Sequence, residues 1–317
     1  MSRRMIFVLL LMLPLVLTGP VLSVKGQNLQ QTDTPPETIK VGIYLIRAGA
    51  LDISTGAIDV DFYLEFTCPS TCKDKITDFE IMNGVTKSKP LVEDEDSETA
   101  PIYRVSATVF QDVSLIKYPF DSHDIKIVIE GNFDNTELMY AVNPKTTAID
   151  PKVFILGWDL DKQSVKAEII PQYYPAWDST YTRYVFTTHI SKPSLAGWLK
   201  GLLPAIFITL GSIFALFITT KNIGNRVAII TSALVASVLY HLNFTSRVPP
   251  IGYLTFGDNF MIINYIVILI SLAITIWIIR SDAPERQEAV KRVNRIEIYA
   301  IPALWIVLHI LNALWIL

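Results

Sequence analysis

The chain has 317 residues, of which 51% are hydrophobic and 18% are charged, and its formal net charge is −3. Its mean hydropathy of +0.38 is too high for an ordinary soluble domain of this size and indicates membrane segments. The near-neutral charge and the absence of a lysine- or arginine-rich tract argue against a nucleic-acid partner.

The N-terminus resembles an export signal. Arg3 and Arg4 precede an apolar run, residues 5–17, and small and turn-prone residues follow up to Gly26. This pattern predicts a secretory signal peptide over residues 1–26, with an uncleaved anchor helix as the alternative.

Residues 28–192 are predicted to form an all-β domain. Short runs rich in Val, Ile, Tyr, Phe and Thr alternate with turn-forming clusters, at 41–46, 58–66, 103–110, 125–130, 164–170 and 182–190. Such runs without a helical period are typical of an antiparallel β-sandwich or barrel. In an exported chain, Cys68 and Cys72 favour a short-loop disulfide, and two thiolates cannot complete a four-cysteine zinc site. We therefore expect no metal site and no cofactor.

Residues 193–317 are predicted to form a transmembrane domain. Four apolar segments, about 195–219, 225–246, 258–280 and 293–317, each approach the roughly 20 residues that span a bilayer as a helix. Basic residues gather in the break after the first segment and around the break after the third. The positive-inside rule places both breaks in the cytoplasm, and the β-domain and the C-terminus outside the cell membrane.

The second segment has a distinctive face. Steps of three and four residues align Gly224, Ala228, Ser232, Val235, Leu239, Leu242 and Ser246. If several copies of the chain contributed this face, the aliphatic positions would form rings that block an aqueous pore by dewetting. The alternative is an ordinary helix–helix interface in a monomer. The other polar residues of the segment, including His241, would face neighbouring helices.

Three motifs carry a family resemblance. They are YPFDSHDIKI (118–127), SKPSLAGWLKGLLPAIF (191–207) and VPPIGYLTFGDNF (248–260). In this order they resemble the aromatic-Pro-Phe-Asp loop, the entry to the first membrane helix and the linker after the pore helix of pentameric ligand-gated ion channels, the Cys-loop receptor superfamily. No cysteines flank the first motif, and the third and fourth helices have a short connection, which resembles the prokaryotic branch.

The resemblance implies an extracellular immunoglobulin-like β-sandwich, a four-helix transmembrane bundle and a homopentamer with a central pore for inorganic ions. An agonist, either a small molecule or a proton, would bind between subunits. The candidate contacts are Phe79, Glu80, Phe133, Tyr173, Tyr174, Trp177 and Tyr181, with Tyr63 or Phe66 across the interface. An aromatic box of this kind suits an amine through cation–π attraction.

The resemblance also assigns residues to gating and selectivity. Pro119, Phe120, Asp121, Lys192 and Pro249 would couple the two domains. Family members usually place an arginine just before the first membrane helix, whereas this chain has Ser191 there with Lys192 beside it. A lysine can pair with Asp121, but without the bidentate fork of an arginine. Lys221, Arg226 and Arg247 lie at the ends of the pore segment with no acid at its inner end. They predict an anion-permeable or weakly selective pore, unless Arg226 points away from it.

Two rival functions remain from the residues alone. The first is a non-conducting, membrane-anchored ligand sensor of the same fold. The second is a polytopic membrane enzyme, which we do not expect, because His241, His309 and Glu297 are too dispersed to form a site within the membrane. The acidic run 93–98 is either a solvated loop or a site for calcium or protons.

Overall fold

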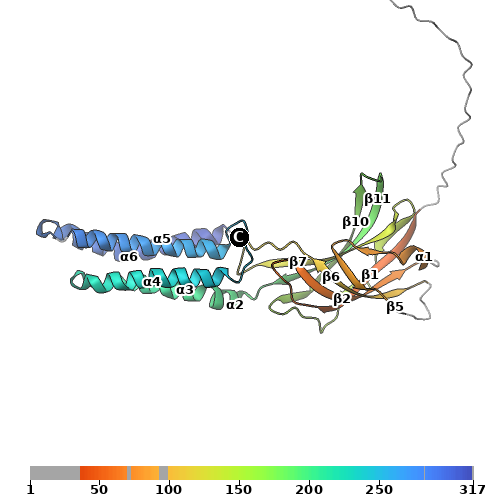
Figure 1. Ribbon diagram of the computed structural model, residues 1–317, viewed down its shortest axis with the longest axis horizontal. Coiled ribbons are helices and arrows are strands. Elements are labelled where there is room, and N and C mark those ends of the chain that lie inside the picture. Colours follow the sequence, from red (N-terminus) through yellow and green to blue (C-terminus); the bar gives the residue numbers. More distant parts are fainter. Residues whose placement is uncertain (1–35, 70–72, 93–98, 282, 316–317) are drawn as a thin grey trace, which may run out of the picture. The chain divides into compact units, whose positions relative to one another are not determined.

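The computed structural model of the chain describes residues 36–69, 73–92, 99–281 and 283–315. The predicted signal peptide, the acidic run 93–98 and Cys72 of the predicted disulfide lie outside these residues. The described part contains strands followed by helices (Figure 1), so the predicted fold class, an all-β sandwich followed by four apolar helices, is confirmed.

The strands form two sheets. In chain order they are β1 (Glu37–Ala48), β2 (Ala57–Thr67), β3 (Glu80–Ile81), β4 (Gly84–Ser88), β5 (Leu91–Val92), β6 (Ile102–Phe110), β7 (Ser122–Asp134), β8 (Leu138–Val142), β9 (Ala148–Ile149), β10 (Asp159–Tyr174) and β11 (Ser179–Ser191), with a short helix α1 (Lys73–Ile76) after β2. One sheet has the order β4-β6-β2-β1-β8, with β5 beside β6 and β9 beside β1. The other has the order β10-β11-β7-β3.

The sandwich core follows from side-chain alternation along the strands. In β2, every second residue is buried, because successive side chains of a strand point to opposite faces. Phe62, Phe66, Phe79, Tyr184 and Phe186 are the largest apolar side chains that are almost completely inaccessible to solvent. One continuous cluster of buried residues draws on both sheets. The β-domain therefore has a hydrophobic core of its own.

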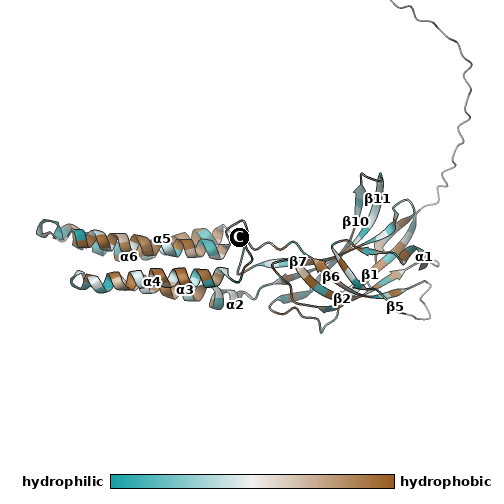
Figure 2. Cartoon of the chain, viewed as in Figure 1, coloured by the Kyte–Doolittle hydropathy of each residue, from teal (hydrophilic) through white to brown (hydrophobic). Residues whose placement is uncertain are grey.

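The C-terminal region contains four helical segments long and apolar enough to cross a membrane (Figure 2). They are Ser194–Ala215, which joins α2 (Ser194–Ala196), a π-helical turn (Gly197–Leu202) and α3 (Leu203–Ala215); Thr220–Thr245, which contains α4 (Ile223–Thr245); α5 (Phe256–Arg280); and Pro284–Leu314, which contains α6 (Gln287–Leu314). Pro204 stands at the start of α3, where its missing N–H is tolerated. The chain is thus a multi-pass membrane protein.

The helices pack in a definite order. The main neighbours of α4 are α3 and α5, and α6 packs on α5 and to a smaller extent on α3. A capping box starts α5, in which the Thr255 hydroxyl accepts the Asp258 N–H while the Asp258 carboxylate accepts the Thr255 N–H. This cap fixes the point where the loop after α4 becomes helical.

Candidate functional site

The tip of the β10–β11 hairpin gathers aromatic side chains. The Tyr174 ring lies 5.4 Å from Trp177 and 5.5 Å from Tyr181, measured between ring centroids. Trp177 is 68% exposed and has no core to pack in. Tyr173 donates a hydrogen bond of 2.8 Å to Asp178, which holds a positive φ of 51° at the turn. The hairpin therefore presents an open aromatic surface.

An ion pair between Arg183 and Glu130 is hydrogen-bonded to Tyr174 of this aromatic surface. Arg183 Nε donates to Glu130 Oε2 at 2.6 Å, the Tyr174 hydroxyl donates to Glu130 Oε1 at 2.8 Å, and Arg183 also donates to the Tyr174 hydroxyl at 2.7 Å. Burial and the bond to Glu130 raise the pKa of Tyr174. Burial acts to lower the pKa of Arg183, but its bonds to Glu130 and Tyr174 outweigh this effect and raise it.

Neither Glu130 nor Arg183 was among the predicted ligand contacts. The signal for Arg183 was its spacing, because it lies two residues after Tyr181 on the same strand face. Glu130 stands opposite Arg183 in the β11–β7 register, and Glu80 stands opposite Glu130 in the β3–β7 register. The structure thus places one arginine and two carboxylates side by side on neighbouring strands.

Two predicted ligand contacts are wrong. Phe66 and Phe79 are 0% and 2% exposed, with ring centroids 5.6 Å apart in the sandwich core, where no ligand on the surface can reach them. Phe133 is partly buried and packs against the same core. The strand alternation decides this outcome, since Glu80 points outward and its neighbour Phe79 does not.

Tyr63 lies on the other sheet, away from the hairpin tip. It stands opposite Tyr44 on β1, and both side chains line a hollow of about 410 Å³ together with Glu65 and Lys145. Within one chain the structure does not bring Tyr63 to the aromatic cluster. Only a second subunit could place such a residue there.

The loop 115–121 joins the β-domain to the helices. The N–H groups of Phe256 and Gly257, in the first turn of α5, donate to the carbonyls of Ile116 and Tyr118 at 2.8 and 3.0 Å. The hydroxyl of Tyr253 accepts the N–H of Leu115 at 2.9 Å. These bonds connect the β-domain directly to the start of α5.

Aromatic packing strengthens the same junction. The Phe120 ring lies 5.3 Å from Trp198 and 5.7 Å from Phe256, and the Tyr118–Pro119 peptide bond is cis. A Cβ atom at Gly197 would lie 2.9 Å from the Phe120 ring, so the close approach of this loop to the first membrane segment requires glycine there.

Asp121 and Lys192 do not form the ion pair that the sequence allowed. The buried carboxylate of Asp121 lies 3.3 Å from Nε2 of His123, while the Lys192 ammonium lies 4.0 Å from the centroid of the Trp158 ring. The two residues are joined only through the backbone, where the Lys192 N–H donates to the Asp121 carbonyl at 3.0 Å. Lys192 therefore finds an aromatic partner in place of a carboxylate.

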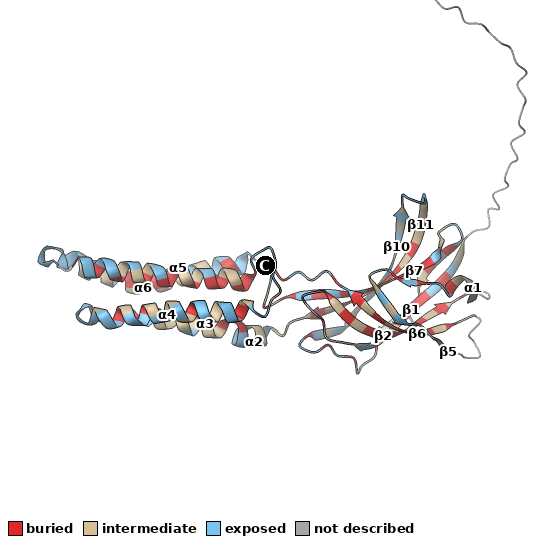
Figure 3. Cartoon of the chain, in the orientation of Figure 1, coloured by how far each residue is buried: buried red, intermediate tan, exposed pale blue. Residues whose placement is uncertain are grey.

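The predicted pore face of α4 is exposed along its whole length (Figure 3). All seven predicted positions are exposed in the single chain, with Val235, Leu239 and Leu242 at 59, 62 and 64%. The buried residues of α4 are Arg226, Ile230, Ser237 and Phe244, which lie on the side toward α3 and α5. The helix thus has one face packed against other helices and one face without a partner among the described residues.

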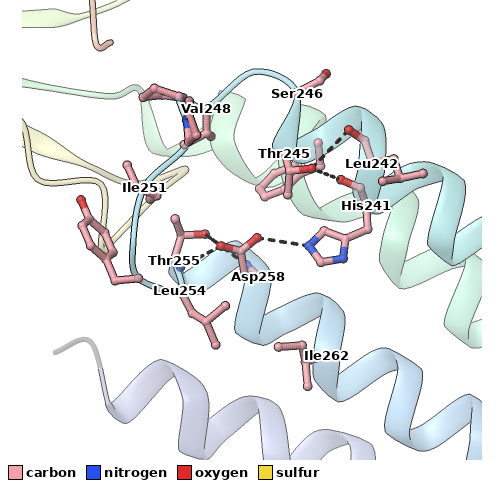
Figure 4. Close-up of a pocket in the computed structure, with 14 residues that line it drawn as sticks. His241, Leu242, Thr245, Ser246, Val248, Ile251, Leu254, Thr255, Asp258 and Ile262 are labelled. Carbon is pink, nitrogen blue, oxygen red and sulfur yellow. Dashed lines mark hydrogen bonds and ion pairs between the residues drawn. The ribbon is translucent and has the colours of Figure 1, made fainter. Parts of the chain in front are cut away.

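A pocket of about 500 Å³ lies at the C-terminal end of α4, beside the loop 248–255 and the first turns of α5 (Figure 4). Pro249, a predicted coupling residue, lines it. His241 Nε2 lies 3.1 Å from Asp258 Oδ1, and His241 Nδ1 lies 2.9 Å from the Tyr265 hydroxyl. As predicted for His241, this residue of α4 contacts a neighbouring helix, α5.

The predicted selectivity residues fall into two groups. Lys221 and Arg247 are exposed, and Arg247 donates a 3.2 Å hydrogen bond to the amide oxygen of Asn243. Arg226, in contrast, is 0% exposed and forms an ion pair with Glu297. Of the two alternatives that the sequence left for Arg226, a place at the pore mouth or a side chain that points away from it, the structure supports the second, because the side chain points into the helix bundle.

Two known proteins are similar to the chain, while no protein-family model matches it. A proton-gated ion channel of Gloeobacter violaceus is 23% identical over an alignment of 322 residues, which covers 91% of this chain and 87% of that protein. Ligand-gated ion channel 50 of Caenorhabditis elegans is 24% identical over 238 residues, 72% of this chain and 46% of that protein.

Proposed function

Because the chain belongs to the pentameric ligand-gated ion channel superfamily, we propose that it forms a homopentamer whose central ion pore opens when an agonist binds outside the cell membrane. The observation that carries the proposal is the unpartnered face of α4, which is exposed from Gly224 to Ser246. Five copies of this face would enclose a path across the membrane.

The composition of this face suits a gated pore. Ser232 would supply a hydroxyl toward the inner end. Toward the outer end, Val235, Leu239 and Leu242 would each form a ring of five aliphatic side chains, one from each subunit. A narrow apolar ring excludes ions because water leaves it, and a modest outward tilt of the helices rehydrates it. The closed state would therefore be held by the aliphatic positions.

The agonist site is proposed at the hairpin tip. Tyr174, Trp177 and Tyr181 offer aromatic faces, and the neighbouring strands offer Glu80 and Glu130 against the single cation of Arg183. This excess of carboxylates and rings favours a small amine. Tyr63 of the adjacent subunit would complete the site from the other sheet.

Coupling would pass through the loop 115–121. Its carbonyls already accept the first N–H groups of α5, and Asp258 in that turn contacts His241 of α4. A movement of the β-domain would thus reach the pore helix α4 through these hydrogen bonds.

Permeation is proposed to favour anions. Lys221 at the inner end of α4 and Arg247 at its outer end are exposed cations, and Asp258, the nearby acid, is occupied by His241 and Thr255. Because Arg226 is buried and paired with Glu297, selectivity would rest on Lys221 and Arg247.

A reversal-potential measurement tests the proposal. Purified protein in a planar bilayer under a tenfold KCl gradient would be challenged with a panel of small amines and with pH steps from 8 to 4. We expect an amine-evoked current that reverses near the chloride potential and falls at least tenfold in Trp177→Ala. Phe154→Ala is the matched control, because Phe154 is 71% exposed on another loop of the β-domain.

The other outcomes are equally informative. Reversal near the potassium potential would refute the anion preference, and activation by acid alone would replace the amine by a proton. Silence under all conditions, with a pentamer confirmed by its mass, would favour a non-conducting sensor.

A further inference from the structure

Arg226, in the first turn of α4, donates hydrogen bonds from its side chain to three residues of other helices. Its Nε donates to the Thr275 hydroxyl at 2.9 Å, and its two terminal nitrogens donate to Asn294 Oδ1 at 2.9 Å and to Glu297 Oε1 at 2.6 Å. The side chains of Arg226 and Glu297 are 0% and 1% exposed. This is a buried polar network built around one guanidinium.

The charges in this network compensate each other. An isolated charge buried in a bundle would be strongly unfavourable, and a planar guanidinium is the cation best suited to bind several acceptors at once. Glu297 supplies the opposite charge, while Thr275 and Asn294 supply neutral oxygens. The two opposite charges nearly cancel, so the electric field of the pair outside the helix bundle is weak.

The network also joins α4 to α6, which is not one of its main neighbours. The main neighbours of α4 are α3 and α5, whereas Asn294 and Glu297 belong to α6 and lie three residues apart on one of its faces. Thr275 belongs to α5. One side chain from α4 thus holds both α5 and α6 near its first turn.

We propose that Arg226 is a positioning residue that ties the inner end of α4 to α6 and keeps its own charge out of the permeation path. The inference rests on the proposed role of α4 as the pore helix. Because α6 is bonded to the base of α4, a displacement of α6 changes the position of the inner pore end. Glu297 and Asn294 would then influence gating without lining the pore.

A double-mutant cycle tests the link. Glu297→Gln leaves a buried arginine without a counter-charge, so it should lower the melting temperature of the purified protein and shift the midpoint of the agonist response at least fivefold. Arg226→Gln together with Glu297→Gln should recover part of both losses, because two neutral amides can bond to each other. Additive losses in the double variant would refute the link.

Ion permeability distinguishes a basic residue that lines the pore from one that is buried in the helix bundle. Arg226→Gln should leave the chloride-to-potassium permeability ratio within twofold of the unaltered channel even where the response midpoint moves. Lys221→Gln is the comparison, because Lys221 is exposed at the same end of the helix. If Arg226→Gln lowered the ratio as strongly as Lys221→Gln, the side chain would face the pore and the proposal would fall.

A chemical measurement on the unaltered protein needs neither folding of a variant nor channel activity. Phenylglyoxal modifies accessible guanidinium groups, and mass spectrometry reports the rate at each arginine. Arg226 should react at least tenfold more slowly than the exposed Arg286. Equal rates would refute the buried network, whereas a slow Arg226 in a silent protein would refute the proposed channel and leave the network standing.

Discussion

The β-domain and the helical region distribute polarity in opposite ways. In the β-domain the fully buried large side chains are apolar, Phe62 and Phe186 among them, whereas in the helices Leu239 and Leu311 are exposed and Arg226 is buried. In the first region burial within one chain reveals the role of a residue. In the second, exposure within one chain does not reveal the role of a leucine, because the surface that it contacts in the membrane lies outside the chain.

Removing an aromatic ring from the core of the β-domain should cause the largest loss of stability, because this core holds the two sheets together. Phe62→Ala deletes a 0% exposed ring and should cost about 3–5 kcal/mol of unfolding free energy. Thermal unfolding of the purified protein would measure the loss. Val85→Ala, at a position 60% exposed on β4, should change the free energy by less than about 0.5 kcal/mol. Equal losses would contradict the assignment of the core.

Alkaline pH should also weaken the β-domain. Burial raises the pKa of Tyr184 to about 12 from its ordinary value of 10.0. Since this pKa is higher in the folded state, the stabilisation is complete below about pH 10 and is lost as the pH rises toward 12, by up to about 2–3 kcal/mol.

Melting temperatures across this range would measure the effect, with Tyr184→Phe as the control because it cannot ionise. We expect the variant to lose less stability than the natural protein above pH 10. Parallel curves for the two proteins would show that other groups cause the alkaline loss.

Two exposed leucines allow α4 and α6 to be compared directly. Leu239 on α4 and Leu311 on α6 are 62 and 56% exposed, yet only Leu239 lies on the proposed pore face. Leu239→Ser should hydrate an apolar ring and raise the current without agonist at least tenfold, about 1.4 kcal/mol in the closed-to-open equilibrium. Leu311→Ser should leave the resting current unchanged. Similar leak currents in both variants would remove the distinction between the two faces.

The smallest effect is expected at the boundary of the two regions. Because Lys192 stacks on Trp158 and Asp121 contacts His123, Asp121→Asn and Lys192→Gln should act independently. Their shifts of the agonist midpoint should combine with a coupling below about 0.5 kcal/mol. A larger coupling in dose–response curves would mean that the two charges meet when the channel opens.

Much of the fold could be predicted from local pattern. Each of the six predicted runs lies inside a strand, and the four apolar segments coincide broadly with the membrane-length helices. The short strands β3, β5 and β9 have two residues each and depend on the partner strand for their existence, so no periodicity could indicate them.

The site was less predictable because its key contacts are distant in sequence. Arg183 meets Glu130 across 53 positions, and Arg226 meets Glu297 across 71. A polar residue in an apolar segment indicates some partner, but composition does not specify which helix provides it. Phe66 occupies a buried position in the alternation along β2, and Phe79 directly precedes β3. Both could have been excluded as ligand contacts if it had been known which side of each strand faces the core.

The two oxygens of Asp258 have separate partners. Oδ2 accepts hydrogen bonds from the backbone and the hydroxyl of Thr255, and Oδ1 contacts His241. If the outer end of α4 swings away and the bond to His241 breaks, neither bond to Thr255 is lost. The carboxylate therefore keeps the first turn of α5 capped whether or not its contact with α4 is intact.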